Sequence, residues 1–105
     1  MTALLVALGA GVGAVVRWAV GRAVPGRRGT LAVNAAGCLA LGVLVGAPTA
    51  AWALLGVGLC GGLTTFSTYA VEAVEGGGPR YVATTTAVCL VAAAVGLAVS
   101  PFPAP

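Results

Sequence analysis

Four long apolar segments, separated by short breaks rich in glycine and proline, dominate the sequence. They cover residues 3–20, 30–47, 50–74 and 81–99, to within a few residues at each end. A helix needs about 20 predominantly apolar residues to cross the hydrocarbon core of a bilayer, and each segment comes close to that length or exceeds it. We therefore expect an all-α integral membrane protein, in which residues 1–105 form one domain of four transmembrane helices.

The low content of charged residues supports this fold class. Hydrophobic residues make up 60% of the chain and charged residues only 7%, whereas soluble domains contain about 25% charged residues. A soluble fold of this composition would expose a very large apolar surface. The net charge of +3 does not indicate nucleic-acid binding, because the arginines lie in short loops and form no basic face.

The arginines also predict how the chain is oriented in the cell membrane. Arg22, Arg27, Arg28 and Arg80 lie in the loops after the first and third segments. The N-terminus, the second loop and the C-terminus contain no arginine. The positive-inside rule then places the arginine-bearing loops in the cytoplasm and both termini outside.

The polar residues do not suit an enzyme. The chain has no histidine, and its two acids, Glu72 and Glu75, lie together at the end of the third segment. No nucleotide-binding motif is present. The three cysteines (Cys38, Cys60 and Cys89) show no CxxC spacing, so we predict neither a disulfide nor a zinc site.

The middle of the third segment is a candidate for a helix break. Residues 61–65 read Gly-Gly-Leu-Thr-Thr, a composition with low helix propensity. A break would free main-chain carbonyls, which must find partners or line a cavity in a membrane, and such carbonyls suit a bound cation. A simple kink is the alternative.

The remaining polar residues of the four apolar segments have neutral side chains that can form hydrogen bonds. A transmembrane serine or threonine often bonds only to a carbonyl of its own helix. The amide of Asn34 cannot be satisfied in that way, so we expect it to face a partner or a water-filled path.

Three motifs resemble those of the Fluc (CrcB) family of fluoride channels. Residues 61–69 followed by Glu72 resemble the third-helix signature of that family. Residues 29–34 with Gly37 resemble its second-helix motif, and residues 11–18 resemble its first. The resemblance extends over essentially the whole chain, with the same plan of four spans.

The resemblance implies an antiparallel dimer with two fluoride pores, which lets fluoride leave the cell passively and so lowers its toxicity. It also implies a structural, untransported Na⁺ at the dimer centre, held by the main-chain carbonyls of Gly61 and Thr64 from each subunit. The matching positions of the fluoride pathway are Asn34, Phe66, Ser67, Thr68, Tyr69, Tyr81, Thr85 and Cys89, with Arg17, Thr30 and Glu72 as supporting residues.

Two positions depart from the family pattern. Tyr69 stands where the family usually has a second phenylalanine, and Cys89 is a weaker donor than serine. The one-sided arginines also argue for a fixed orientation. Our hypothesis is that this subunit pairs with a homologous subunit of opposite orientation, with a homodimer as the alternative.

Two other functions fit four short spans. A small multidrug exporter would need an acid in its first helix, and residues 3–20 contain none. A non-conducting assembly subunit would use close helix packing at the GxxxG pairs Gly9/Gly13, Gly42/Gly46 and Gly58/Gly62.

Overall fold

The computed structural model describes residues 1–104, and this part of the chain is helical with no β-strand. The prediction of an all-α fold is confirmed. The elements are α1 (Thr2–Ala23), α2 (Arg27–Leu44), α3 (Thr49–Ala51), the π-helical η1 (Trp52–Cys60), α4 (Gly61–Leu63), α5 (Ser67–Glu72), the π-helical η2 (Ala73–Gly77) and α6 (Gly78–Val99). Two helical stretches, Thr2–Ala23 and Thr49–Val99, are long and apolar enough to cross a membrane.

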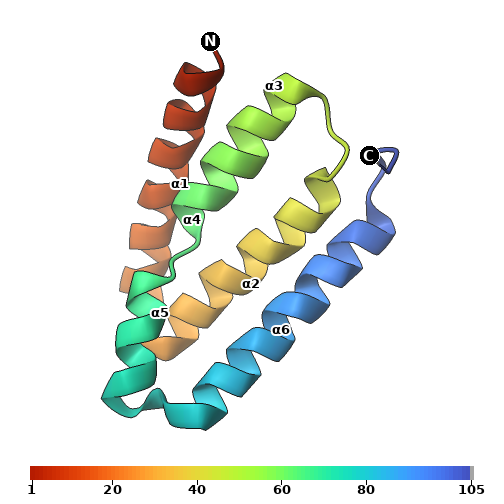
Figure 1. Ribbon diagram of the computed structural model, residues 1–105. Coiled ribbons are helices and arrows are strands. Elements are labelled where there is room, and N and C mark those ends of the chain that lie inside the picture. The colour runs from red at the N-terminus through yellow and green to blue at the C-terminus, as the bar shows by residue number, and fades with distance from the viewer. Residues whose placement is uncertain (105) are drawn as a thin grey trace.

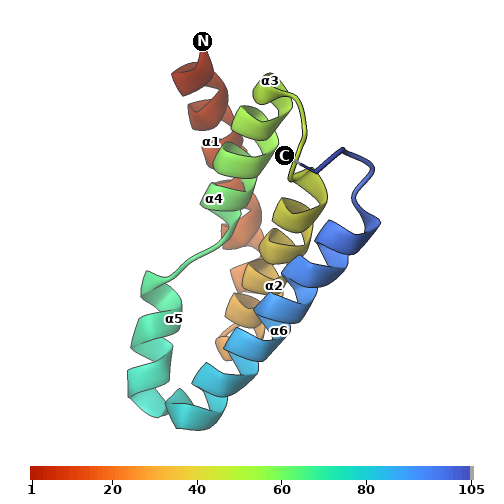
Figure 2. The same ribbon diagram turned by 45° about the vertical axis from the view of Figure 1, so that its right-hand side comes forward.

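The helices form a bundle in which two pairs of neighbours run in the same direction: α2 with α6, and α1 with the series from α3 to α4. In Figures 1 and 2, α2 and α6 lie side by side and run the same way. The series from α3 to α5 runs in the opposite direction, as does α1. Both ends of the chain lie at one end of the bundle, and the turns after α1 and α5 lie at the other (Figure 1).

Two helices begin earlier than the apolar segments predict. The second starts at Arg27 rather than near residue 30, and α6 starts at Gly78 rather than at residue 81. Proline fits the first turn of a helix, where its missing N–H needs no partner, so Pro79 lies inside α6. The chain reverses at Glu75 and Gly76, whose backbone angles are not helical.

Glycines allow the helices to touch through their main chains. A side chain at Gly9 or Gly13 of α1 would collide with the main chain of η1, at Leu54 and Leu59 respectively. A side chain at Gly42 of α2 would collide with the carbonyl of Ala93 in α6. Backbone approach of this kind is how helices pack in lipid, where the hydrophobic effect does not drive association.

The helix of the third segment is broken between α4 and α5. Thr64 is extended, with φ −82° and ψ 158°, and helix resumes at Ser67. Figure 2 shows α5 leaving the line of α4 after this stretch. The predicted break is therefore present, although Gly61 and Gly62 are still helical and the unwound residues are 64–66.

Little of the bundle is buried by the chain itself. No large side chain is fully buried among the described residues, and α1 exposes apolar residues along its length, such as Leu4, Val12 and Trp18. Apolar faces of this extent need lipid or a protein partner to cover them.

Candidate functional site

The break is held open by a side chain from another helix. Asn34 of α2 donates from Nδ2 to the carbonyl of Thr65 at 2.9 Å, and its Oδ1 accepts from the N–H of Thr65 at 2.7 Å. Asn34 is 8% exposed, so this pair is largely shielded. The partner that the sequence required for Asn34 is thus the unwound main chain of the same subunit.

This pairing releases carbonyls from the helical pattern. The N–H of Thr65 bonds to Asn34, so it does not complete the helical bond to the carbonyl of Gly61. The N–H of Thr68 bonds to Oγ1 of Thr65 at 3.2 Å, so it does not pair with the carbonyl of Thr64. Both predicted cation ligands, Gly61 and Thr64, are therefore carbonyls without their usual amide partners.

Main-chain oxygens are suitable ligands for a hard cation. Gly61 is exposed, and nothing lies within 4 Å of the position that a Cβ would occupy. The described residues contain no group of three or more His, Cys, Asp or Glu side chains that could hold a metal ion. The released carbonyls are the oxygen ligands that the break offers to a hard cation.

Three threonine hydroxyls bond to a main-chain carbonyl one turn earlier in the chain. Oγ1 donates to the carbonyl one turn earlier in Thr30 (3.4 Å), Thr64 (2.9 Å) and Thr86 (2.8 Å). Thr85 differs. It is 7% exposed, and its Oγ1 is buried without a hydrogen-bond partner among residues 1–104. A buried hydroxyl in this state is costly and is available to a ligand.

Thr85 lines an open groove between α2, α6 and the third segment. The groove has a volume of about 670 Å³ and its lining is mainly apolar. It brings together several of the predicted residues, namely Asn34, Gly61, Thr64, Phe66, Tyr69, Thr85 and Cys89. Ser67, Thr68 and Tyr81 do not line it. Cys38 and Trp52 also line the groove and were not among the predicted site residues.

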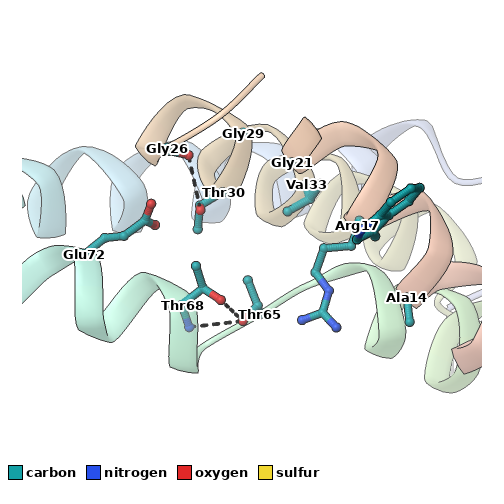
Figure 3. A pocket seen from close by; sticks show the side chains of 11 residues that line it. Ala14, Arg17, Gly21, Gly26, Gly29, Thr30, Val33, Thr65, Thr68 and Glu72 are labelled. Atoms are coloured by element: carbon teal, nitrogen blue, oxygen red, sulfur yellow. Dashed lines mark hydrogen bonds between the residues drawn. The ribbon is translucent and has the colours of Figure 1, made fainter. Parts of the chain in front are cut away.

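The predicted supporting residues line a second cavity, which lies beside the break on the side of the turns after α1 and α5. Its volume is about 340 Å³, and Figure 3 shows Arg17 and Glu72 on opposite sides of it. Thr30, Thr65 and Thr68 also line this cavity. Thr65 lines both cavities. The two hydrogen bonds between Thr65 and Asn34 therefore lie between the cavities.

The aromatic rings of Phe66, Tyr69 and Tyr81 form a series that runs from the break toward the turns after α1 and α5. The ring centroids of Phe66 and Tyr69 are 5.8 Å apart, and those of Tyr69 and Tyr81 are 5.5 Å apart. The Tyr81 hydroxyl donates to Oε1 of Glu72 at 3.1 Å, and the Arg27 guanidinium lies 5.9 Å from the Tyr81 ring. Phe66 begins the series and is 78% exposed. The link from Tyr81 to Glu72 and Arg27 was not predicted, because it joins residues from three elements.

Comparison with known proteins gives a consistent family. Residues 4–98 match the family described as CrcB-like protein, Camphor Resistance (CrcB). The fluoride-specific ion channel FluC 2 of Rhodococcus jostii is 55% identical over 80 residues, which cover 70% of each chain. FluC 1 of Streptomyces avermitilis, also a fluoride-specific ion channel, is 43% identical over 112 residues, covering 93% of this chain and 90% of the relative.

A third relative, the fluoride-specific ion channel FluC 2 of Halobacterium salinarum, is 44% identical over 108 residues, covering 91% of this chain and 84% of its own. These relatives are named as ion channels, a class of protein that is not enzymatic. The motifs and the break that suggested the resemblance fall inside the matched range. The chain belongs to the CrcB family.

Proposed function

We propose that this chain is a subunit of a fluoride-specific ion channel, through which fluoride leaves the cell passively. The observation that carries the proposal is the Thr85 hydroxyl, which is buried and unpartnered in the groove that Asn34 also lines. The CrcB relatives named as fluoride-specific channels supply the identity of the ion.

The chemistry of the groove suits a small, strongly hydrated anion. An amide nitrogen carries two N–H donors, and Asn34 uses one of them for the Thr65 carbonyl, which leaves one. The Thr85 hydroxyl is a second donor, and the exposed Phe66 ring offers its electropositive edge. Neutral donors replace water without holding the ion as strongly as a cationic side chain would, and this balance is what conduction requires.

The remaining pathway residues extend this set. Ser67 and Thr68 lie at the start of α5, where their hydroxyls are within 3.5 Å and 3.2 Å of Oγ1 of Thr65. Tyr69 and Cys89 line the groove, and Tyr81 continues the aromatic series. In this proposal Arg17, Thr30 and Glu72 support the pathway from the second cavity.

In the membrane, α1, α2, the third segment and α6 would each form one span, with both termini outside and the arginine-bearing loops in the cytoplasm. The shared location of the two ends in Figure 1 is compatible with an even number of crossings. The break between residues 63 and 67 would then lie near the middle of the bilayer.

The proposed functional unit is an antiparallel dimer with two pores and one structural Na⁺. Each chain offers two released carbonyls, from Gly61 and Thr64, so two chains would provide four oxygen ligands. Bound there, the ion would neutralise the partial charge of these oxygens. The exposed apolar surface of α1 and the exposed ring of Phe66 support a protein partner.

The arginine distribution favours a partner of opposite orientation that is a homologue rather than a second copy. A homodimer is the alternative. Reconstituting this chain alone in liposomes separates the two, because full sodium-dependent fluoride flux without any partner would contradict the heterodimer.

The function itself is tested by fluoride-electrode efflux from liposomes, with and without the partner. We expect Thr85→Val to reduce fluoride flux, while Thr84→Val, at an exposed position of the same helix outside the groove, leaves it unchanged. Asn34→Asp and Phe66→Ile should also abolish flux. A non-conducting assembly subunit would instead show no cost from any of these changes, and an exporter would show flux of organic cations.

A further inference from the structure

Two cysteines of the groove come from different helices and lie at the same level. The close contact of Gly42 with the Ala93 carbonyl fixes how far α2 is shifted along α6. The two helices run in the same direction (Figure 1), so the residues one turn before each contact also face one another. Those residues are Cys38 and Cys89, and both line the groove.

The pair is accessible from the groove. Cys38 and Cys89 are both half-buried, and both line the groove. Cys60 lines it as well but is only 3% exposed. Neither member of the pair belongs to a disulfide in the structure, so both sulfurs are free to act as ligands.

Two free thiols in one groove suit a cation that accepts two sulfur ligands. Zinc needs four ligands, and the described residues provide no cluster of three or more candidate side chains. Soft thiolates select Cu(I) among the common first-row ions, and Cu(I) and Ag(I) form linear complexes with two thiolates. We propose that Cys38 and Cys89 form a two-thiolate site for a soft monovalent cation of the Cu(I) and Ag(I) type.

Binding would proceed with loss of protons. Each thiol gives up its proton as its sulfur binds the cation, so two protons leave for each cation bound. The resulting complex carries one negative charge, because two thiolates surround one positive ion. In the groove this complex lies one turn from Asn34 and Thr85, where it would both narrow the passage and repel an anion. Only this inhibitory effect rests on the proposed function; the binding site does not.

The direct test uses Ag⁺ in chloride-free nitrate buffer on the purified protein in detergent. One equivalent of Ag⁺ should be bound per chain, and it should protect Cys38 and Cys89, but not Cys60, from alkylation as read by mass spectrometry after denaturation. Protection of a single cysteine, or of Cys60 in place of either partner, would overturn the proposal without any variant.

The Ag⁺ affinity of cysteine variants tests the site independently of the alkylation experiment. A second ligand held nearby raises affinity by roughly 100-fold or more over one ligand. Cys38→Ser and Cys89→Ser should therefore each weaken Ag⁺ binding by at least that factor, whereas Cys60→Ser, the matched control, should retain it. Equal affinity in all three variants would show binding to isolated thiols and refute the pair.

Fluoride efflux measured with Ag⁺ separates the two proposals. Tight binding with blocked flux supports both. Tight binding to a protein that never conducts fluoride would leave the thiolate site standing and count against the channel. Fluoride flux in a protein that binds no Ag⁺ at Cys38 and Cys89 would support the channel and refute the thiolate site.

Discussion

The side-chain amide of Asn34 and the main chain of Thr65 are joined by two hydrogen bonds, one donated in each direction. The amide group replaces the helical partners that the unwound residues have lost. It also fixes the N–H of Thr65 away from the Gly61 carbonyl. One side chain thus stabilises the break and leaves oxygens available at it.

Removing this amide should destabilise the break. Asn34→Ala leaves the N–H and C=O of Thr65 without these partners, and each buried group left unpaired costs about 1–3 kcal/mol. We expect a lower melting temperature in detergent together with loss of fluoride flux. Thr84→Ala is a suitable control, since Thr84 is exposed on α6 and lies outside the groove. A variant at Asn34 with unchanged melting and flux would contradict this role.

Close packing of α1 on η1 should tolerate no side chain at Gly9. Its Cβ would meet the main chain at Leu54, Gly58 and Leu59, and overpacking costs about 1–3 kcal/mol. We expect Gly9→Ala to lower thermal stability. The control is Gly11→Ala on the same helix, where nothing lies within 4 Å of the added Cβ. Equal stability of the two variants would show that the helices separate easily.

Ser100, which follows the C-terminal end of α6, forms a hydrogen bond to α2. Its hydroxyl donates to the carbonyl of Val43 at 2.6 Å and accepts from the N–H of Phe102 at 3.3 Å. Ser100→Ala should cost about 0.5–1.5 kcal/mol for the lost bond to Val43, and Ser100→Thr should retain most of it. Faster proteolysis of the C-terminal tail in the alanine variant only is the measurement.

Sodium removal tests the proposed cation site. If the carbonyls of Gly61 and Thr64 bind Na⁺ between two subunits, replacing Na⁺ by a large organic cation should reduce fluoride flux and weaken the dimer. Both effects should reverse when Na⁺ is restored. Flux that is the same in the two media would argue that the released carbonyls do not bind Na⁺.

The fold class followed from the sequence because apolar length and low charge leave few alternatives for the chain. The break was predicted from the local composition of residues 61–65, but its position was not. Gly62 remains helical and packs closely against Ala10, while the unwinding occurs where Asn34 captures Thr65, 31 residues away in sequence. Local propensity contains no information about such a distant partner.

The candidate site could be predicted only in part, because contacts between distant segments also decide which of its residues meet. Asn34 could be singled out because an amide in an apolar segment needs a partner. Only the family resemblance separated Thr85 from its neighbours Thr84 and Thr86, since the three read alike in the sequence. The structure adds that the Thr85 hydroxyl is buried without a hydrogen-bond partner in the described part of the chain. Cys38 was missed as a groove residue because its opposition to Cys89 depends on the parallel alignment of α2 and α6.

The released carbonyls of Gly61 and Thr64 have a consequence for the life of the protein in the cell. In lipid, each unsatisfied backbone group costs several kcal/mol. If the proposed dimer covers these carbonyls, a copy that inserts without a partner retains this penalty and is less stable than an assembled one. The amount of this protein that accumulates should therefore follow the supply of its partner rather than its own rate of synthesis.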